Sequence, residues 1–269
     1  MKKFLVTVLA ILMVISMSAC TKTVEHERLD ADGNLKGYVV ETLDATLNNR
    51  CRKLEFLDEN KNVVSTMQAD ENFYYIWSFI DPEIVSFPYT PMCYPANEYP
   101  NGVMRIILFD YENKQDVSEY YTFPFSDQIM EEYQKTYNSH DGAIYYTSVK
   151  VYNNDGSVKF SYVADEGNYF NIAMLVDAQM DNCIQINEMN STGEDARISE
   201  FTLETYEFIS SQSYEYTSES ANEPKYTYNY KADGSLWYKV ENIFNDEGYI
   251  TDVIYYDANG NILDEIPKI

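Results

Sequence analysis

The chain has 269 residues, which is enough to bury a sizeable hydrophobic core in one large domain or two smaller ones. Its 44 acidic and 19 basic residues give a formal charge of −25, which argues against nucleic acid and anionic lipid as binding partners, because both reward Lys and Arg. The 26 tyrosines and 13 phenylalanines argue against disorder and favour an all-β protein whose sheet faces are half buried.

Residues 1–19 have the order of segments found in secretory signal peptides. Lys2 and Lys3 form a short positive region, and a nearly unbroken apolar run of 14 residues follows at 4–17. Such a run fits the apolar region of a signal, about 7–15 residues, and is shorter than the roughly 20 residues of a membrane-spanning helix. We therefore expect residues 1–19 to be removed on export.

The end of this segment, Met17-Ser18-Ala19-Cys20, resembles the lipobox of bacterial lipoproteins, in which small residues precede a cysteine that is lipidated and becomes the new N-terminus. The resemblance implies that lipid on Cys20 anchors the protein in the cell membrane or outer membrane, facing the extracytoplasmic side. Two acyl chains on one cysteine supply the two hydrophobic signals that stable anchoring requires. The alternative is an ordinary signal that is cut after Ala19. Residues 20–28 are polar and lack periodicity, so we expect a tether there.

Three cysteines remain after Cys20 is assigned to lipid. Export permits disulfides, but three thiols leave one unpaired; the candidate bridge joins Cys51 and Cys93, and the sequence alone does not decide the pairing. Cys51, Cys93 and Cys183 stand far apart in the sequence without C-x-x-C spacing, which does not indicate a zinc site. The sequence predicts neither a metal nor a cofactor.

Glycine marks a series of turns from residue 29 to the end of the chain. An apolar or aromatic residue stands four before the glycine and an aliphatic one two after it. The copies are Leu29-x-x-Asp32-Gly33-x-Leu35, Tyr152-x-x-Asp155-Gly156-x-Val158, Tyr230-x-x-Asp233-Gly234-x-Leu236, Phe244-x-x-Glu247-Gly248-x-Ile250 and Tyr256-x-x-Asn259-Gly260-x-Ile262, with Lys61 in the glycine slot of a degenerate copy. Asp-Gly and Asn-Gly predict tight hairpins, because both residues tolerate positive φ.

The spacing of these turns predicts the fold. Turns every 11 to 14 residues leave strands of about five to nine residues. Between the turns, aromatic residues alternate with other residues, which puts the aromatic side chains on one face of a strand. We therefore expect residues 29–269 to form an antiparallel β-meander, either an open twisted sheet or a barrel-like one. One domain, or two lobes with a seam near residues 126–140, would satisfy the pattern.

Two of the heptapeptides, Tyr230-Lys231-Ala232-Asp233-Gly234-Ser235-Leu236 and Tyr256-Asp257-Ala258-Asn259-Gly260-Asn261-Ile262, resemble the turn core of YD repeats in bacterial surface proteins. The resemblance covers five or six heptapeptides, mostly after residue 150, and implies wound β-sheet and surface recognition. The family's repeat is longer than the spacing here, so the resemblance supports a β-meander and not a large shell. Convergent hairpin turns in a Tyr-rich sheet are the alternative.

Two segments depart from the strand pattern. Residues 126–137 predict a short helix, because a Ser or Asp N-cap precedes apolar residues at helical spacing. Residues 69–80 fit a buried helix or a buried strand equally well. The long segment 82–100 contains five of the eight prolines and predicts a surface loop or a binding loop.

The sequence carries no motif that specifies a reaction. It contains only two histidines, His26 and His140, and lacks the serine elbow, the zinc-protease helix and the phosphate-binding glycine loop. We therefore expect a non-catalytic binding or interaction module for a glycan or an envelope protein, and its candidate ligand-binding residues are Trp77, Tyr89, Tyr94 and Trp237. The alternatives are an envelope glycoside hydrolase with paired carboxylates and a structural or assembly lipoprotein.

Overall fold

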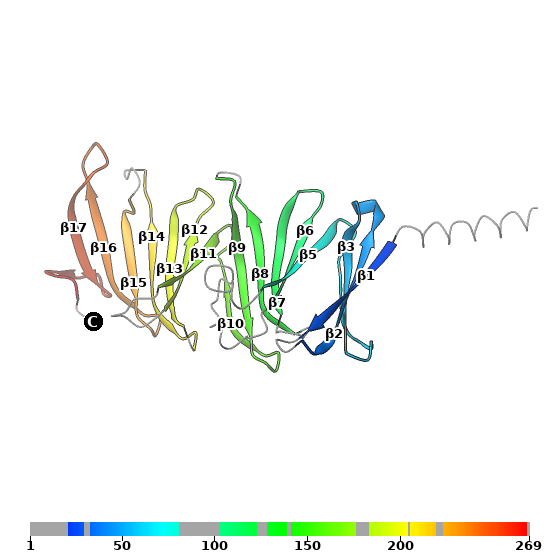
Figure 1. Cartoon of the computed structure of the whole chain (residues 1–269). Helices are drawn as coiled ribbons and strands as arrows, with labels where there is room; N and C mark the ends of the chain where they lie inside the picture. The colour runs from blue at the N-terminus through cyan, green and yellow to red at the C-terminus, as the bar shows by residue number, and fades with distance from the viewer. Residues whose placement is uncertain are drawn as a thin grey trace, which may run out of the picture. The chain divides into compact units, whose positions relative to one another are not determined.

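The computed structural model describes residues 21–29, 33–80, 103–122, 128–138, 141–175, 183–203, 205–218 and 223–267. Across these ranges the chain is all-β, and 18 strands form one antiparallel sheet that is not closed (Figure 1). Strands that follow one another in sequence pair along most of the chain. These observations confirm the predicted β-meander and establish its open form.

The strands vary in length from 2 to 10 residues. In chain order they are β1 (Thr21–Leu29), β2 (Leu35–Asp44), β3 (Arg50–Leu57), β4 (Val63–Gln68), β5 (Phe73–Ile80), β6 (Val103–Asp110), β7 (Gln115–Thr122), β8 (Ile129–Tyr137), β9 (Ile144–Tyr152), β10 (Val158–Val163), β11 (Tyr169–Leu175), β12 (Cys183–Met189), β13 (Asp195–Thr202), β14 (Phe208–Glu215), β15 (Tyr226–Tyr230), β16 (Leu236–Phe244), β17 (Ile250–Asp257) and β18 (Ile262–Leu263). The helical structure in the described ranges is one 3-10 turn, η1 (Ala45–Leu47). None of their helices could cross a membrane.

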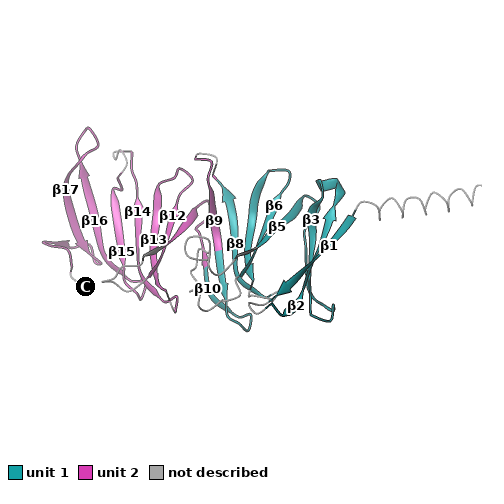
Figure 2. Ribbon diagram, viewed as in Figure 1, with its two compact units in different colours: residues 1–90, 94–137, 149–161 teal, residues 91–93, 138–148, 162–269 magenta. Residues whose placement is uncertain are grey.

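The chain divides into two compact units (Figure 2). Unit 1 comprises residues 1–90, 94–137 and 149–161, and unit 2 comprises residues 91–93, 138–148 and 162–269. The core of unit 1 gathers apolar side chains from β2 to β6: Val39, Cys51, Leu54, Phe56, Ala69, Tyr75, Met104 and Ile106. The buried apolar side chains of unit 2 come mainly from β11 to β13: Tyr169, Phe170, Cys183, Ile184, Ile186, Phe201 and Tyr206.

The hairpin turns contain the predicted glycines, but their geometry differs from the expected one. In the turn after β15, the N–H of Gly234 donates to the carbonyl of Lys231 at 2.8 Å, and only the glycine has positive φ, +77°. This is the pattern of a type I turn followed by a left-handed residue and a bulge. Asp233 acts through its side chain, since Oδ1 accepts the N–H of Ser235 at 2.9 Å. Lys61 takes the left-handed slot of the degenerate copy, with φ +65°.

Residues 21–28 of the expected tether instead contribute most of β1. This strand pairs with β2 along its whole length. Two of its three inward positions, His26 and Arg28, are polar, which hid the alternation; Arg28 is the most buried, only 4% exposed. Arg28 donates to the carbonyl of Leu57 at 3.1 Å and occupies space that a glycine leaves open: a Cβ on Gly37 would lie 2.7 Å from Arg28 Nη2.

Residues 126–137, expected to be helical, contain strand β8 from Ile129 onward. Glu, Gln, Lys and Met favour helices, but pairing with β7 overrides that preference. Met130, Glu131 and Tyr133 are all buried, and the phenol of Tyr133 donates to the carboxylate of Glu131. The ambiguous segment 69–80 resolves as strand β5, which begins at Phe73.

A three-strand motif occurs twice in the chain. In the first copy, β3 pairs with β4 and also with β5, where Cys51 lies opposite Tyr75. In the second copy, β9 pairs with β10 and also with β11, where Tyr146 lies opposite Phe170. Within each copy, the first strand therefore pairs with both of the other two strands.

The same tripeptide precedes the third strand of both copies, Ala69-Asp70-Glu71 in one and Ala164-Asp165-Glu166 in the other. The alanine N–H donates to a carbonyl of the first strand in each case, Arg52 in one copy and Thr147 in the other, both at 2.9 Å. Matching sequence, pairing and hydrogen bond identify an internal repeat that the glycine pattern did not reveal.

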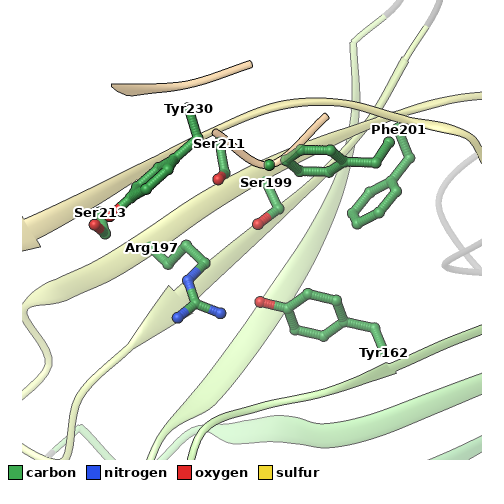
Figure 3. Close-up of a pocket in the computed structure, with 9 residues that line it drawn as sticks. Tyr162, Arg197, Ser199, Phe201, Ser211, Ser213 and Tyr230 are labelled. Atoms are coloured by element: carbon green, nitrogen blue, oxygen red, sulfur yellow. The ribbon is translucent and has the colours of Figure 1, made fainter. Parts of the chain in front are cut away.

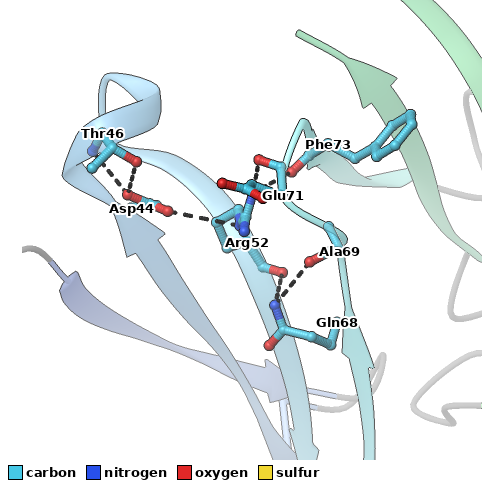
Figure 4. A network of polar contacts seen from close by, with 7 residues as sticks. All are labelled: Asp44, Thr46, Arg52, Gln68, Ala69, Glu71 and Phe73. Carbon is cyan, nitrogen blue, oxygen red and sulfur yellow. Dashed lines mark hydrogen bonds and ion pairs between the residues drawn. The ribbon is translucent and has the colours of Figure 1, made fainter.

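Arg52 fixes the connecting loop of the first copy (Figure 4). Its guanidinium donates to the carbonyl of Glu71 and, at 3.4 Å, to that of Phe73, and it lies 3.7 Å from the carboxylate of Asp44. Asp44 also accepts the hydroxyl and N–H of Thr46 at 2.6 and 2.8 Å. The bond from the Thr46 hydroxyl, helped by the charge of Arg52, holds the pKa of Asp44 below its usual value. These contacts tie β2, β3 and β5 together.

Candidate functional site

Trp77, a ligand candidate from the sequence, contributes to the packing of unit 1. Its side chain packs against the core, and the indole N–H donates to Glu41 Oε1 at 2.8 Å. The imidazole of His26 lies 3.0 Å from the same oxygen and meets the indole edge-on, with ring centroids 5.1 Å apart. These contacts explain why Trp77 is present without a ligand.

Cys51 is buried and forms no disulfide with another cysteine of the described residues. Burial, with the negative charge of Glu41, raises the pKa of Cys51 to about 12, so the sulfur stays protonated and unreactive at neutral pH. The other cysteine and tyrosine candidates, Cys20, Tyr89, Cys93 and Tyr94, lie outside the described residues. The lipid on Cys20 and the Cys51–Cys93 bridge therefore stay predictions.

A polar cluster in unit 1 is filled by its own side chains, and Arg105, 34% exposed, is the member that reaches solvent. Glu119 on β7 is 2% exposed and binds three neighbours: the guanidinium of Arg105 at 2.5 Å, the ammonium of Lys135 and the phenol of Tyr121. Burial alone would raise the pKa of Glu119, but the hydrogen bond from Arg105 and the charge of Lys135 outweigh it and hold this pKa below its usual value. The cluster resembles a buried structural ion pair, which needs such partners to remain charged.

In unit 2, one face of the sheet around β13 and β14 is hollow (Figure 3). The hollow has a volume of about 450 Å³ and is walled by aromatic rings around a floor of serines. Its lining residues are Tyr162, Arg197, Ser199, Phe201, Phe208, Ser211, Ser213, Tyr230 and Gly234. We call this feature the unit 2 hollow.

Strand register brings the floor of the unit 2 hollow together. Successive side chains of a strand point to opposite faces, so Arg197 and Ser199 on β13 share one face. On β14, Ser213 lies opposite Arg197 and Ser211 lies opposite Ser199. Tyr230 on β15 then lies opposite Ser211. Three neighbouring strands thus present hydroxyl groups and one guanidinium to the same space.

The end of the hollow near β10 is held by a buried carboxylate. The phenol of Tyr162 donates to Glu188 Oε2 at 2.6 Å, and Glu188, which has no exposed surface, also accepts the N–H of Asp165 at 3.0 Å and the side-chain amide of Asn168 at 2.7 Å. Burial, together with the bond to Glu188, raises the pKa of Tyr162, so its ring stays neutral and fixed. The ring meets that of Phe201 edge-on at 6.2 Å.

The charge in the unit 2 hollow is balanced locally. Arg197 Nη2 donates to the carboxylate of Asp165 at 2.8 Å, and these side chains are 39% and 61% exposed. An exposed pair of this kind contributes little stability, so Arg197 is available to a ligand at small cost. Aromatic walls, hydroxyl groups and a partly neutralised cation suit the apolar faces and hydroxyl groups of a sugar.

A second hollow, about 500 Å³, lies beside Trp237 at the start of β16. Trp237 is the extra residue of a bulge, because Tyr238 lies opposite Asn229 while Leu236 lies opposite Tyr230. The rings of the two sequence neighbours Trp237 and Tyr238 touch edge-on at 5.1 Å, which a regular strand would not permit. The bulge thus turns Trp237 into a wall of this hollow.

Paired catalytic carboxylates do not converge on either hollow. The unit 2 hollow is lined by no carboxylate, and Glu200 is the one acid that lines the hollow beside Trp237. No cluster of three or more potential metal ligands occurs among the described residues. The hollows offer binding surfaces more than reactive groups.

No family model matches the chain, and no curated protein matches it. Among solved structures, a protein of unknown function from Bacteroides caccae is 15% identical with a TM-score of 0.16; the match covers 57% of this chain and 61% of that one, so it spans about three fifths of the other protein. Hsv2 from Kluyveromyces lactis is 9% identical with a TM-score of 0.19, covering 79% of this chain and 80% of that one. Similarities this weak carry no argument about function.

Proposed function

We propose that this chain is a non-catalytic binding module of the bacterial cell envelope, held by lipid on Cys20 and facing the extracytoplasmic side. The unit 2 hollow is the observation that carries the proposal, because fixed aromatic walls above a hydroxyl floor favour recognition of a ligand. The signal and lipobox pattern of residues 1–20 supports the location.

The ligand chemistry follows from the side chains that line the hollow. Rings such as Phe201 and Tyr230 offer apolar faces, while Ser199, Ser211 and Ser213 offer hydroxyl groups at close spacing. A glycan, or a polar segment of an envelope protein, presents both kinds of surface. Nucleic acid is unsuited, because the chain carries a charge of −25.

The experiment measures equilibrium binding of the full chain in detergent micelles to cell-wall glycans, host glycans and neighbouring envelope proteins. Ser213→Trp should fill the hollow and weaken binding at least tenfold, because Ser213 lines it. Gln212→Trp is the matched control, since its exposed side chain lies on the opposite face of β14. Silence of the wild-type chain toward all three classes would contradict the proposal.

The anchor is tested separately through Cys20. Cys20→Ser removes the thiol that would carry the lipid, so it should release a soluble protein or leave an uncut precursor. Fractionation of cells and the mass of the N-terminal peptide measure both outcomes. Unchanged membrane retention with residues 1–19 uncut would show that the apolar run itself is the anchor.

A further inference from the structure

A row of tyrosines leads out of the unit 2 hollow along β15. Tyr226, Tyr228 and Tyr230 stand at alternate positions, so their side chains share one face of the sheet. Tyr230 lies opposite Ser211 and Tyr228 lies opposite Ser213, and both serines line the hollow. The tyrosine row is therefore continuous with the floor of the hollow.

The same face continues across the next two strands. On β16, Lys239 lies opposite Tyr228, and on β17, Tyr256 lies opposite Lys239. The ammonium of Lys239 sits 4.2 Å from the ring centre of Tyr226 and 4.7 Å from that of Tyr256, where each ring attracts the cation. We call Tyr226, Tyr228, Tyr230, Lys239 and Tyr256 the tyrosine track.

The rings of the tyrosine track are held in place before any ligand arrives. The phenol of Tyr228 donates to Glu215 at 2.9 Å, and that of Tyr256 donates to Glu241 at 2.7 Å. Lys225 in turn pairs with Glu241 at 3.3 Å. A preorganised surface loses little conformational entropy on binding, which favours affinity.

The track and the hollow extend over five strands, β13 to β17. Neighbouring strands lie about 4.8 Å apart, so the surface is about 19 Å long across the strands. That length suits a chain of several linked units and exceeds what a single small molecule would cover. The unit 2 hollow would hold one end of such a chain.

Main-chain hydrogen bonding argues that the chain is not a polypeptide. β14, β15 and β16 each pair with a strand on both sides, so their backbone groups are already used. A peptide that lay across β13 to β16 would find no strand edge on which to pair its own N–H and C=O groups. A sugar chain needs only ring faces and side-chain hydroxyl and carboxylate groups, and these the track supplies.

Charge selects among sugar chains. Two cations near the track are balanced by acids, Arg197 by Asp165 and Lys225 by Glu241, and Lys239 within the track lies against the rings of Tyr226 and Tyr256. The whole chain carries −25, so it repels polyanions. We infer that the ligand is a neutral polysaccharide, which lies across β13 to β17 with one end in the unit 2 hollow; this inference rests on the proposed function.

The test is a length series. The full chain in detergent micelles is titrated with β-1,4-linked glucose oligomers and with β-1,4-linked N-acetylglucosamine oligomers of one to six units. The Kd should fall at least tenfold from one unit to about five units and then level off, because the track has a finite length.

Variants separate the track from the hollow. Tyr228→Ala should remove most of the gain with length and leave the Kd of the single unit unchanged, whereas Tyr228→Phe keeps the ring and should stay within about threefold of wild type. Tyr238→Ala is the matched control, because Tyr238 lies opposite Asn229 on the other face. If Tyr228→Ala does not fold by circular dichroism, Tyr256→Ala replaces it.

The outcomes distinguish the inference from the proposed function. Equal Kd values for one and six units would overturn the track while leaving the hollow as a binding site. Binding of an extended polypeptide that depends on Tyr228 would overturn the assignment to a polysaccharide. No binding by any oligomer, envelope protein or host glycan would overturn both.

Discussion

The two copies of the three-strand motif share their pairing and differ in what surrounds them. Cys51 opposite Tyr75 in the first copy corresponds to Tyr146 opposite Phe170 in the second. On the strands that follow, β7 carries the buried Glu119 on the face opposite to that of Tyr75, whereas β13 carries Ser199 on the same face as Phe170. One copy precedes a closed cluster of charges, and the other precedes an open hollow.

The difference shows two ways in which a sheet face can carry polar side chains without a large loss of stability. A buried carboxylate such as Glu119 must be paired, so unit 1 supplies Arg105, Lys135 and Tyr121 around it. Hydroxyl groups such as those of Ser199 and Ser211 cost far less to leave for water or a ligand. The face with serines can therefore stay open, whereas the face with charges is closed.

The largest expected effect comes from breaking the closed cluster. Glu119→Ala removes the nearer of the two carboxylates around Lys135, a cation whose side chain is 6% exposed, and leaves it Asp116 at 3.3 Å; it also removes the carboxylate that holds Arg105. It should lower the free energy of unfolding by about 3–5 kcal/mol, whereas Ser199→Ala should lower it by less than about 1 kcal/mol. Denaturant titrations of both variants measure this; equal losses would contradict the contrast between the units.

A glycine in each unit gives the second effect. A Cβ on Gly37 would lie 2.1 Å from the carbonyl oxygen of Leu57, while a Cβ on Gly234 would meet nothing within 4 Å. Gly37→Ala should therefore lower the free energy of unfolding by about 3 kcal/mol, because of steric overlap and backbone strain. Gly234→Ala should lower it by about 1–2 kcal/mol, because of the positive φ alone. Thermal melts compare the two, and a Gly234→Ala cost as large as that of Gly37→Ala would count against this assignment.

Alkaline stability gives a third comparison, between Tyr75 and its counterpart Phe170. Burial raises the pKa of Tyr75 to about 12, against about 10 in an unfolded chain. The folded state therefore keeps this proton longer than the unfolded state, and the stability it contributes is complete below pH 10 and lost as pH rises through 12.

Tyr75→Phe removes that titration and makes unit 1 resemble unit 2 at this site. Between pH 8 and pH 12 the free energy of unfolding of the variant should fall by about 2–3 kcal/mol less than that of wild type. Urea titrations at several pH values measure the difference. Parallel pH profiles for the two proteins would show that Tyr75 ionises as easily in the folded state as in the unfolded state.

The smallest effect concerns the exposed pair of unit 2. Asp165→Asn breaks the 2.8 Å contact with Arg197, but both side chains are well exposed. The free energy of unfolding should change by less than about 1 kcal/mol, and the change should shrink in high salt. A loss above about 2 kcal/mol, measured by urea titration, would mean that the hollow relies on this pair for its structure.

The meander could be predicted from the sequence because its signals are local. Gly234 and the other turn glycines mark the hairpins, and alternation between them marks the strands. The predicted helix was wrong at residues 129–137, because pairing with β7 overrides the helix preference of the Glu and Lys residues there. Strand β1 was missed because Arg28 is buried, whereas an arginine in a sequence is normally taken to face solvent.

The hollow could not be predicted, because it depends on register. Arg197, Ser213 and Tyr230 meet only when three strands are aligned, and bulges such as the one at Trp237 shift that alignment by one residue. Residue type alone suggested Trp77 as a ligand-binding residue, but this large aromatic side chain packs against the core of unit 1. Trp237, another candidate, does line a hollow, yet its orientation is set by the bulge.

Hydrogen–deuterium exchange of the full chain, with and without a neutral six-unit oligosaccharide, tests the central claim most directly. The account predicts slower exchange over residues 195–215, 226–244 and 250–257, where the hollow and the track lie, and unchanged exchange over β6 to β8 of unit 1. Protection confined to β6–β8, or none in either unit at saturating oligosaccharide, would contradict it.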